Sequence, residues 1–98
     1  MSSYAAVWQS RNGLPHSGRL ELTHSGLWLH GGSRESEERV GIPYGEILGV
    51  ERDANTHIGP CRAITVLSRN AGELLIASVG GVGVLTDIFA ALHGTLSL

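Results

Sequence analysis

Histidine is the residue type in this chain best suited to bind a metal or to transfer protons near neutral pH. The sequence has five of them, spread over separate predicted loops and strands: His16, His24, His30, His57 and His93. A zinc site needs three or four ligands at spacings that reinforce one another. His24 and His30 could meet across the ends of one hairpin, and His57 lies near Cys61, but neither pair has such a spacing. We therefore predict surface histidines, with no metal site and no cofactor.

Nucleophilic catalysis would need a serine or cysteine beside a base and an orienting acid in a cleft. The chain has many serines, but none lies in a recognisable nucleophile elbow. Cys61, the single cysteine, cannot form an intrachain disulfide, and we expect it to be a small apolar filler. A filled core in 98 residues also leaves little room for a deep pocket. We predict no enzymatic activity. The alternative, a small hydrolase or isomerase, would need a deep pocket with two convergent titratable residues.

The balance of charge argues against nucleic acid as a partner. The formal net charge is −2 and all seven basic residues are arginines, and the isoelectric point is about 6.2. Nucleic-acid binders instead carry a basic stripe and have a high isoelectric point. An anion would find its best ligands in Arg11, His16 and Arg19, around the first predicted strand-to-strand loop. The alternative is that these three residues are ordinary solvated loop charges.

Aromatic residues make up only 5% of the chain, so Trp8 and Trp28 carry more information than most side chains. Trp28 and His30 alternate with Leu27 and Leu29, so the first two should project from the outer face of their strand. Large exposed aromatic side chains anchor many protein interfaces. Two interpretations remain open: Trp28 anchors an interface with His30 beside it, or the N-terminal segment or the terminal helix covers it.

A period-two alternation of apolar and polar residues predicts the strands that must position these side chains. In one of them Leu20 and Leu22 should face the core. The predicted strands are Tyr4–Arg11, Arg19–Thr23, Leu27–His30, Val40–Ile42, Ile47–Arg52, Arg62–Ser68 and Glu73–Val79. The second and third should form a hairpin, and so should the last two.

The segments between these strands have the composition of turns and loops. Ser33–Arg39 is charged and is predicted to be an exposed loop. Pro43 should end the fourth strand, because it cannot donate to a central ladder. A bulge is expected near Gly49, since Ile47 and Val50 differ in parity. The chain should then turn through Asp53–Pro60.

After the segment Gly80-Gly81-Val82-Gly83 the apolar period changes to about 3.6, which predicts a helix. Its apolar face comprises Leu85, Ile88, Phe89, Leu92 and Leu96. We expect the helix to run from about Val82 to His93 and to stop at Gly94, with Asp87 and His93 near its first and last turns. The glycine-rich segment lacks the spacing of a phosphate-binding loop and is predicted to be a connector.

Three longer stretches carry a likeness to a known family: GRLELTHSGLWLHG from Gly18 to Gly31, RVGIPYGEILGVE from Arg39 to Glu51, and AITVLSRNAGELLIASV before the helix. With six or seven short strands and one terminal helix, the chain resembles bacterial pleckstrin-homology-like (PH-like or GRAM-like) domains over nearly all of its length. The resemblance implies a mainly β (α+β) fold, in which a bent antiparallel sheet or split barrel of six to seven strands is capped by one C-terminal helix. In such domains a strand ending in Ile-Pro enters a turn with an acidic residue, here Glu46.

Lipid-binding members of the broader family hold phosphate with basic residues around the first strand-to-strand loop. The matching positions here are Arg11, Arg19 and Glu21. Glu21 is acidic and would repel phosphate oxygens, so the match argues against phosphoinositide binding. The fold hosts lipid binders, peptide binders and scaffolds, and it does not choose among them.

We therefore predict a single domain over residues 1–98 that acts as a non-catalytic interaction module. It should bind a protein partner, or a second copy of itself, through a sheet face or edge near Trp28. The alternative is a weak site for an anionic ligand or a phospholipid headgroup at Arg11, His16 and Arg19. No apolar run is long enough to span a membrane and no signal peptide is evident, so we expect a cytoplasmic protein.

Overall fold

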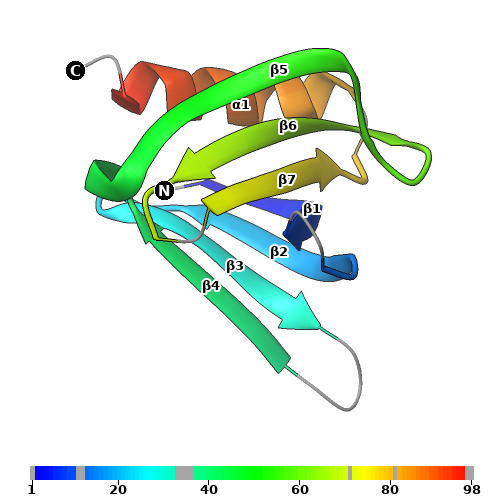
Figure 1. Cartoon of the computed structure of the whole chain (residues 1–98), viewed down its shortest axis with the longest axis horizontal. Coiled ribbons are helices and arrows are strands. Elements are labelled where there is room, and N and C mark those ends of the chain that lie inside the picture. The colour runs from blue at the N-terminus through cyan, green and yellow to red at the C-terminus, as the bar shows by residue number, and fades with distance from the viewer. Residues whose placement is uncertain (1, 11–12, 33–36, 71, 81, 97–98) are drawn as a thin grey trace.

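Seven β-strands, one 3-10 turn and a C-terminal helix follow one another along the chain (Figure 1). The computed structural model describes residues 2–10, 13–32, 37–70, 72–80 and 82–96. The elements are β1 (Ser2–Ser10), β2 (His16–Leu22), β3 (Gly26–Gly32), β4 (Glu37–Pro43), η1 (Tyr44–Glu46), β5 (Ile47–Ile58), β6 (Cys61–Ser68), β7 (Gly72–Ser78) and α1 (Val82–Leu96). The mainly β architecture with one terminal helix is the one that the sequence predicts.

All seven strands belong to one antiparallel sheet, in the order β4-β3-β2-β1-β7-β6-β5. Most neighbours are also consecutive along the chain, but β1 pairs with β7, so that Ala6 faces Ser78 and Trp8 faces Ile76. This pairing joins the four N-terminal strands to the three C-terminal ones. The sheet curls into a half-barrel whose edge strands are β4 and β5, and η1 connects the two edges (Figure 1).

The pleat of the curled sheet sends alternate side chains to its concave side, where they form the main core. Leu20 and Leu22 of β2 are buried there as predicted, as are Leu27 and Leu29 of β3. The buried residues of the main core come from every strand and from the helix: Ala6, Trp8, Leu20, Leu22, Leu27, Leu29, Ile42, Ile47, Ile64, Val66, Leu74, Ile76, Leu85, Ile88 and Leu92. The inward set repeats every second residue along each strand.

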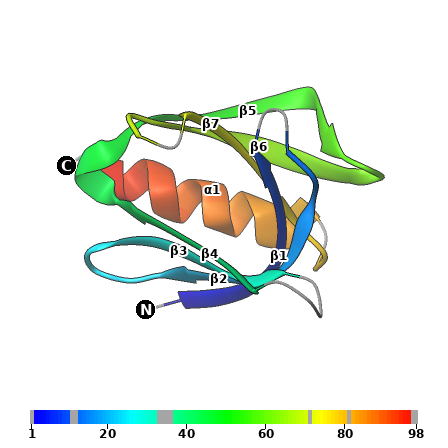
Figure 2. The same ribbon diagram turned by 60° about the horizontal axis from the view of Figure 1, so that its bottom comes forward.

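The helix α1 seals the concave side with its apolar stripe. Leu85, Ile88 and Leu92 are buried and Phe89 is half-buried, as the helical period predicts. Figure 2 shows α1 running in the space between β2, β3 and β4 on one side and β5, β6 and β7 on the other. The side chain of Leu96, which was predicted to belong to the same stripe, lies outside the described part of the structure.

The predicted C-terminal end of the helix is wrong. The helix continues through Gly94 to Leu96, and Gly94 does not adopt the positive φ that a glycine helix stop requires. Asp87 lies beyond the first turn, which contains no acidic residue, whereas His93 does lie in the last turn. The helix can pass through this position because a glycine in a helical conformation is only about 1 kcal/mol worse than alanine.

β4 and β5 extend furthest beyond their predicted bounds, and β2 and β3 are also longer than predicted. β4 begins at Glu37, so the predicted loop Ser33–Arg39 is wrong over its last three residues, while residues 33–36 lie outside the described chain. β5 continues to Ile58, although Asp53–Pro60 was predicted to be a turn. β4 and β5 tolerate charged and polar side chains because they are the edge strands of the sheet, and an edge strand is open to solvent on its unpaired side.

The ladder between β5 and β6 is irregular in two places. One register shift falls between Ile47 and Gly49, which confirms the predicted bulge, and a second falls between Arg52 and His57. Extra residues in one strand of an antiparallel pair bend that strand and increase its twist. The shifts therefore let the long strand β5 follow the curl of the half-barrel.

The indole of Trp8 fills the concave face where two glycines replace side chains. Gly18 and Gly31 face each other in the β2–β3 ladder, and Trp8 is 2% exposed. A Cβ atom at Gly31 would lie 2.7 Å from Cη2 of Trp8 and 2.2 Å from the carbonyl oxygen of Ser17. The bare backbone at this position is therefore what admits the large ring to the core.

The turn between β2 and β3 is tied to η1 by a small polar network. Within the turn, the Thr23 hydroxyl accepts from the backbone N–H groups of Ser25 and Gly26, each at 3.2 Å. The hydroxyl of Tyr44 donates to the carbonyl oxygen of Thr23 at 2.5 Å. The backbone N–H of Tyr44 donates to the carbonyl oxygen of Ser25 at 3.3 Å. These bonds position the crossing from β4 to β5.

A second, smaller cluster lies on the other side of the sheet from the main core. The register places Val7, Ala77 and Ala63 opposite one another in one row across β1, β7 and β6. Ile58 completes the buried part of this cluster, and Cys61 packs against it half-buried as a free cysteine. The prediction that Cys61 is a small apolar filler is confirmed.

Replacing Gly94 by alanine should stabilise the protein by about 0.5–1 kcal/mol, because alanine has the higher helix propensity and no atom lies within 4 Å of the new Cβ. Urea denaturation followed by circular dichroism measures the change. A lower free energy of unfolding in Gly94→Ala would mean that the helix ends at this glycine in a left-handed conformation.

Replacing Tyr44 by phenylalanine should lower the free energy of unfolding by about 1 kcal/mol at neutral pH, because the bond to Thr23 is lost. Burial raises the pKa of Tyr44 above its ordinary value. The stability that neutral Tyr44 provides is thus fully present below about pH 10 and is lost as the pH rises through the raised pKa. The difference between wild type and Tyr44→Phe should therefore shrink in alkaline solution, and a constant difference would contradict this account.

Candidate functional site

The outer face of the N-terminal half of the sheet carries the tryptophan and most of the cations singled out from the sequence. The strand register defines two neighbouring rows across β1, β2, β3 and β4. The first row contains Ser3, Glu21, Trp28 and Gly41, and the second contains Ala5, Arg19, His30 and Arg39. We call this surface, made of the side chains in these two rows, the Trp28 face.

Trp28 is exposed, and its ring rests on the edge strand. It is 39% exposed, and a Cβ atom at Gly41 would lie 2.3 Å from its Cζ3 atom. The indole thus lies over the backbone of Gly41 in β4, its direct partner in the ladder. This contact with β4 supplies part of the cover of Trp28. The outward orientation predicted for Trp28 and His30 is confirmed.

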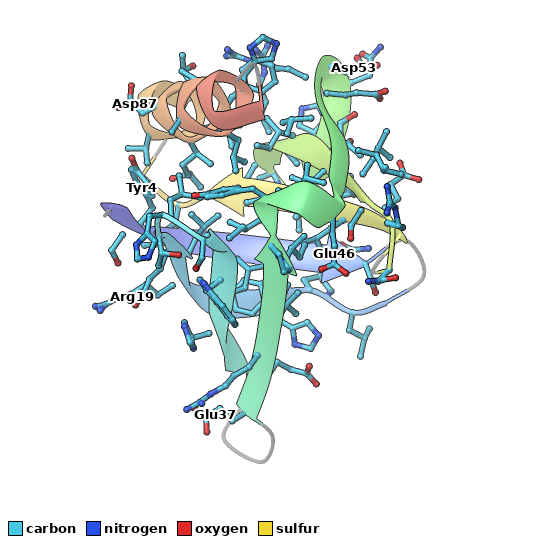
Figure 3. All side chains as sticks on the ribbon, turned by 90° about the vertical axis from the view of Figure 1, so that its left-hand side faces the viewer. Tyr4, Arg19, Glu37, Glu46, Asp53 and Asp87 are labelled. Atoms are coloured by element: carbon cyan, nitrogen blue, oxygen red, sulfur yellow. The ribbon has the colours of Figure 1, made fainter. Side chains whose placement is uncertain are left out.

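Three basic side chains share the second row. Arg19, His30 and Arg39 follow one another across β2, β3 and β4, and the two arginines are exposed while His30 is half-buried. Directly opposed residues in antiparallel strands lie about 4.5–5.5 Å apart, so the row spans about 10 Å. Figure 3 shows Arg19 pointing away from the body of the protein. The row therefore brings two guanidinium groups and one imidazole together on one face of the sheet.

The outer face is hollowed beside this row. A shallow pocket with a volume of about 450 Å³ is lined by Ser3, Tyr4, Ala5, Gly18, Arg19 and His30. Small side chains at Ser3, Ala5 and Gly18 leave the backbone uncovered, because neighbouring strands carry nothing large enough to fill the space. Arg19 contributes a guanidinium group to this lining, and His30 contributes an imidazole. The hollow is therefore open to solvent and faces two nitrogen-bearing groups.

The structure does not bring together the anion site predicted from the first loop. His16 and Arg19 are three residues apart on β2, so their side chains point to opposite faces of the sheet. The ring of His16 is half-buried, with its centroid 6.0 Å from that of the core residue Trp8. Arg11 lies outside the described residues. Only Arg19 of these three residues belongs to the Trp28 face.

Arg39 is the member of the site that sequence reasoning missed. It was placed in a charged loop, yet it pairs with His30 across the β3–β4 ladder. Burial alternates along all of β4, but Glu38 stands at the position in phase with Val40 and Ile42. The apolar alternation in the sequence therefore stops at Val40, and the charged residues before it have a composition that edge strands and loops share.

The histidines do not gather into a metal site. Over the described ranges, no group of three or more histidine, cysteine, aspartate or glutamate side chains is placed to hold a metal ion.

A second hollow, of about 260 Å³, lies beside the start of α1 and is lined by Arg52, Asp53, Arg62, Ala63 and Leu85. A carboxylate oxygen of Asp53 accepts from the backbone N–H of Asn55 at 2.9 Å. Asp53 therefore already supports the local backbone of β5.

No helix within the described part of the chain combines the length and the apolar character needed to cross a membrane.

Comparison with known proteins bears on the fold alone. No protein-family model matches the chain, and no curated protein matches it. Among solved structures, the chain is similar to the C-terminal domain of an unknown protein from Leishmania infantum, with a TM-score of 0.73 and 17% sequence identity. The alignment covers 100% of this chain and 84% of that one. At this identity the shared feature is the arrangement of strands and helix.

Replacing Gly41 by alanine should displace the indole of Trp28, because the new methyl group would occupy the space of its six-membered ring. Trp28 should then become more exposed to water, while Trp8 stays buried. We expect a red shift in tryptophan emission and stronger quenching by iodide. Gly45→Ala is the matched control, since nothing lies within 4 Å of a Cβ at that glycine. Unchanged quenching in Gly41→Ala would contradict the stacking of Trp28 on β4.

Proposed function

We propose that this protein is a non-catalytic interaction module that binds a protein partner through the Trp28 face. The observation that carries the proposal is the exposed indole held against the backbone of Gly41. A side chain already fixed by packing loses little conformational entropy on binding, so its apolar surface contributes more fully to affinity. Tryptophan and arginine are also the side chains most enriched among those that dominate binding energies.

The sheet face is a better candidate for the contact than the free edge of β4. That edge carries Glu37, Glu38 and Arg39 and ends in Pro43, and charges and proline are the devices that prevent unselective strand pairing. The face beside it combines one large aromatic side chain with a hollow and a row of cations. A partner that used the face would bury Trp28 without needing to extend the sheet.

A lipid-headgroup site at the first loop has less support. Its predicted ligands His16 and Arg19 lie on opposite faces of β2, and Glu21 shares a face with Arg19. Of the three predicted ligands, Arg19 is therefore the only one that the described part of the structure places on this exposed face. The Trp28 face is the better-supported binding surface.

Replacing Trp28 by alanine should weaken the partner complex by about 30-fold or more, the loss typical of an interface anchor. Partners are captured with immobilised wild-type protein from the source cells, purified, and titrated by calorimetry against wild type and Trp28→Ala. Leu14→Ala is the matched control, because Leu14 is 79% exposed and lies in the β1–β2 loop, outside the Trp28 face. Light scattering at two protein concentrations tests whether the partner is a second copy of the chain. Equal affinities of wild type and Trp28→Ala for every captured partner would refute the proposal.

A further inference from the structure

We propose that the partner segment is an acidic peptide in extended conformation, which places a carboxylate in the hollow beside Arg19 and His30 and an apolar side chain on Trp28. This inference rests on the proposed function and specifies the chemistry of the partner. It joins two features that sequence reasoning treated as rival sites, the tryptophan and the cations.

The hollow has the size and the lining for a carboxylate side chain. Its volume is about 450 Å³, and Arg19 and His30 supply its nitrogen donors. The rest of the lining is Ser3, Tyr4 and Ala5 of β1 and Gly18 of β2. An arginine guanidinium binds a carboxylate through two parallel hydrogen bonds. An imidazole offers at least one N–H donor in either protonation state. These donors select an acceptor group that carries negative charge.

The nitrogen donors of Arg19 and His30 are available for a ligand. Within the part of the chain that the structure describes, neither Arg19 nor His30 has a hydrogen-bond or ion-pair partner. Arg39 does have one, because its Nη2 atom lies 3.7 Å from Oε1 of Glu37. Both of those side chains are more than two-thirds exposed, and ion pairs of that kind contribute little. A carboxylate from a partner would therefore compete with Glu37 at small cost.

The spacing of the two subsites matches an extended chain. His30 and Trp28 are alternate residues of β3, and alternate residues of a strand are about 6.6 Å apart. Side chains at positions i and i+2 of an extended peptide have the same separation and point to the same side. One peptide strand lying along β3 could thus set an acidic side chain over the His30 row and an apolar one over Trp28.

Glu21 sets the orientation of such a peptide. It faces Trp28 directly across the β2–β3 ladder, so the row of Trp28 holds a carboxylate while the row of His30 holds only basic or small side chains. A second acidic group of the partner would be repelled from the Trp28 row. The face therefore selects an apolar side chain in one row and an acidic side chain in the other.

The same charges disfavour an anionic membrane as the occupant. Membrane binding by electrostatics needs several clustered basic residues. This face offers two arginines, with Glu21 and Glu37 among them, on a chain whose net charge is −2. A single extended peptide can avoid both glutamates, whereas a flat array of headgroups cannot.

The test uses a fluorescein-labelled synthetic peptide whose central stretch alternates glutamate with leucine between serine and glycine flanks. Fluorescence anisotropy measures its binding to the full chain at low salt. We expect wild type to bind this probe about tenfold more tightly than the same peptide with glutamine in place of glutamate. Arg19→Gln and His30→Gln should each remove most of that difference, and added salt should weaken the binding of the glutamate probe.

Three further measurements test the apolar contact, the specificity for the charges of this face and the membrane alternative. Trp28→Ala should weaken binding of both probes, because it removes the apolar contact and leaves the cations in place. Arg69→Gln, which removes an exposed charge on the β6–β7 turn, should change neither affinity. Vesicles of phosphatidylcholine containing about one-fifth phosphatidylserine should not bind wild type in a sedimentation assay.

Several results would overturn the inference. They are an absence of saturable binding of the glutamate probe up to about 1 mM, equal affinity for the two probes, or vesicle binding that depends on Arg19. If the glutamine probe binds equally well and still depends on Trp28, the acidic specificity is wrong but the proposed interface stands. If Trp28→Ala alters neither the probes nor any captured partner, the proposed function itself fails.

Discussion

The structure depends on one constraint: a single curled sheet must bury its concave side against one helix. The inward side chains of all seven strands meet Leu85, Ile88 and Leu92 of α1 in one cluster. Because burial of these apolar side chains is the main source of stability, the positions that point inward are not free to serve another purpose. Chemistry and recognition are left to the outward positions, of which the Trp28 face holds the most distinctive set.

The two tryptophans lie on opposite faces of the sheet, and each packs against a glycine. Trp8 reaches the core because Gly31 presents no Cβ to its ring, and Trp28 lies flat on the outside because Gly41 presents none. The first contact contributes to the core and the second fixes a large apolar surface in solvent. Both use the same physical device, an aromatic ring packed on bare backbone in the neighbouring or next strand.

Several features of the candidate site follow from local sequence, and one does not. The alternation of Leu27, Trp28, Leu29 and His30 correctly separates core from surface. The grouping of Arg19 with His30 and Arg39 depends on register between strands, which no local pattern encodes. The split between His16 and Arg19 could be predicted from their parity, but the predicted strand began only at Arg19 and left His16 in a loop.

The sequence by itself determined a fold of six to seven strands with one terminal helix, the inward side of the second and third strands and the apolar stripe of the helix. These follow from side-chain periods of two and 3.6 within short segments. Tertiary structure alone decided the pairing of β1 with β7 and the continuation of β5 to Ile58. It also decided that the helix passes through Gly94 and that Trp28 rests on Gly41. Each of these outcomes depends on atoms distant in the chain, because packing and ladder hydrogen bonds outweigh local preferences of a kcal/mol or less.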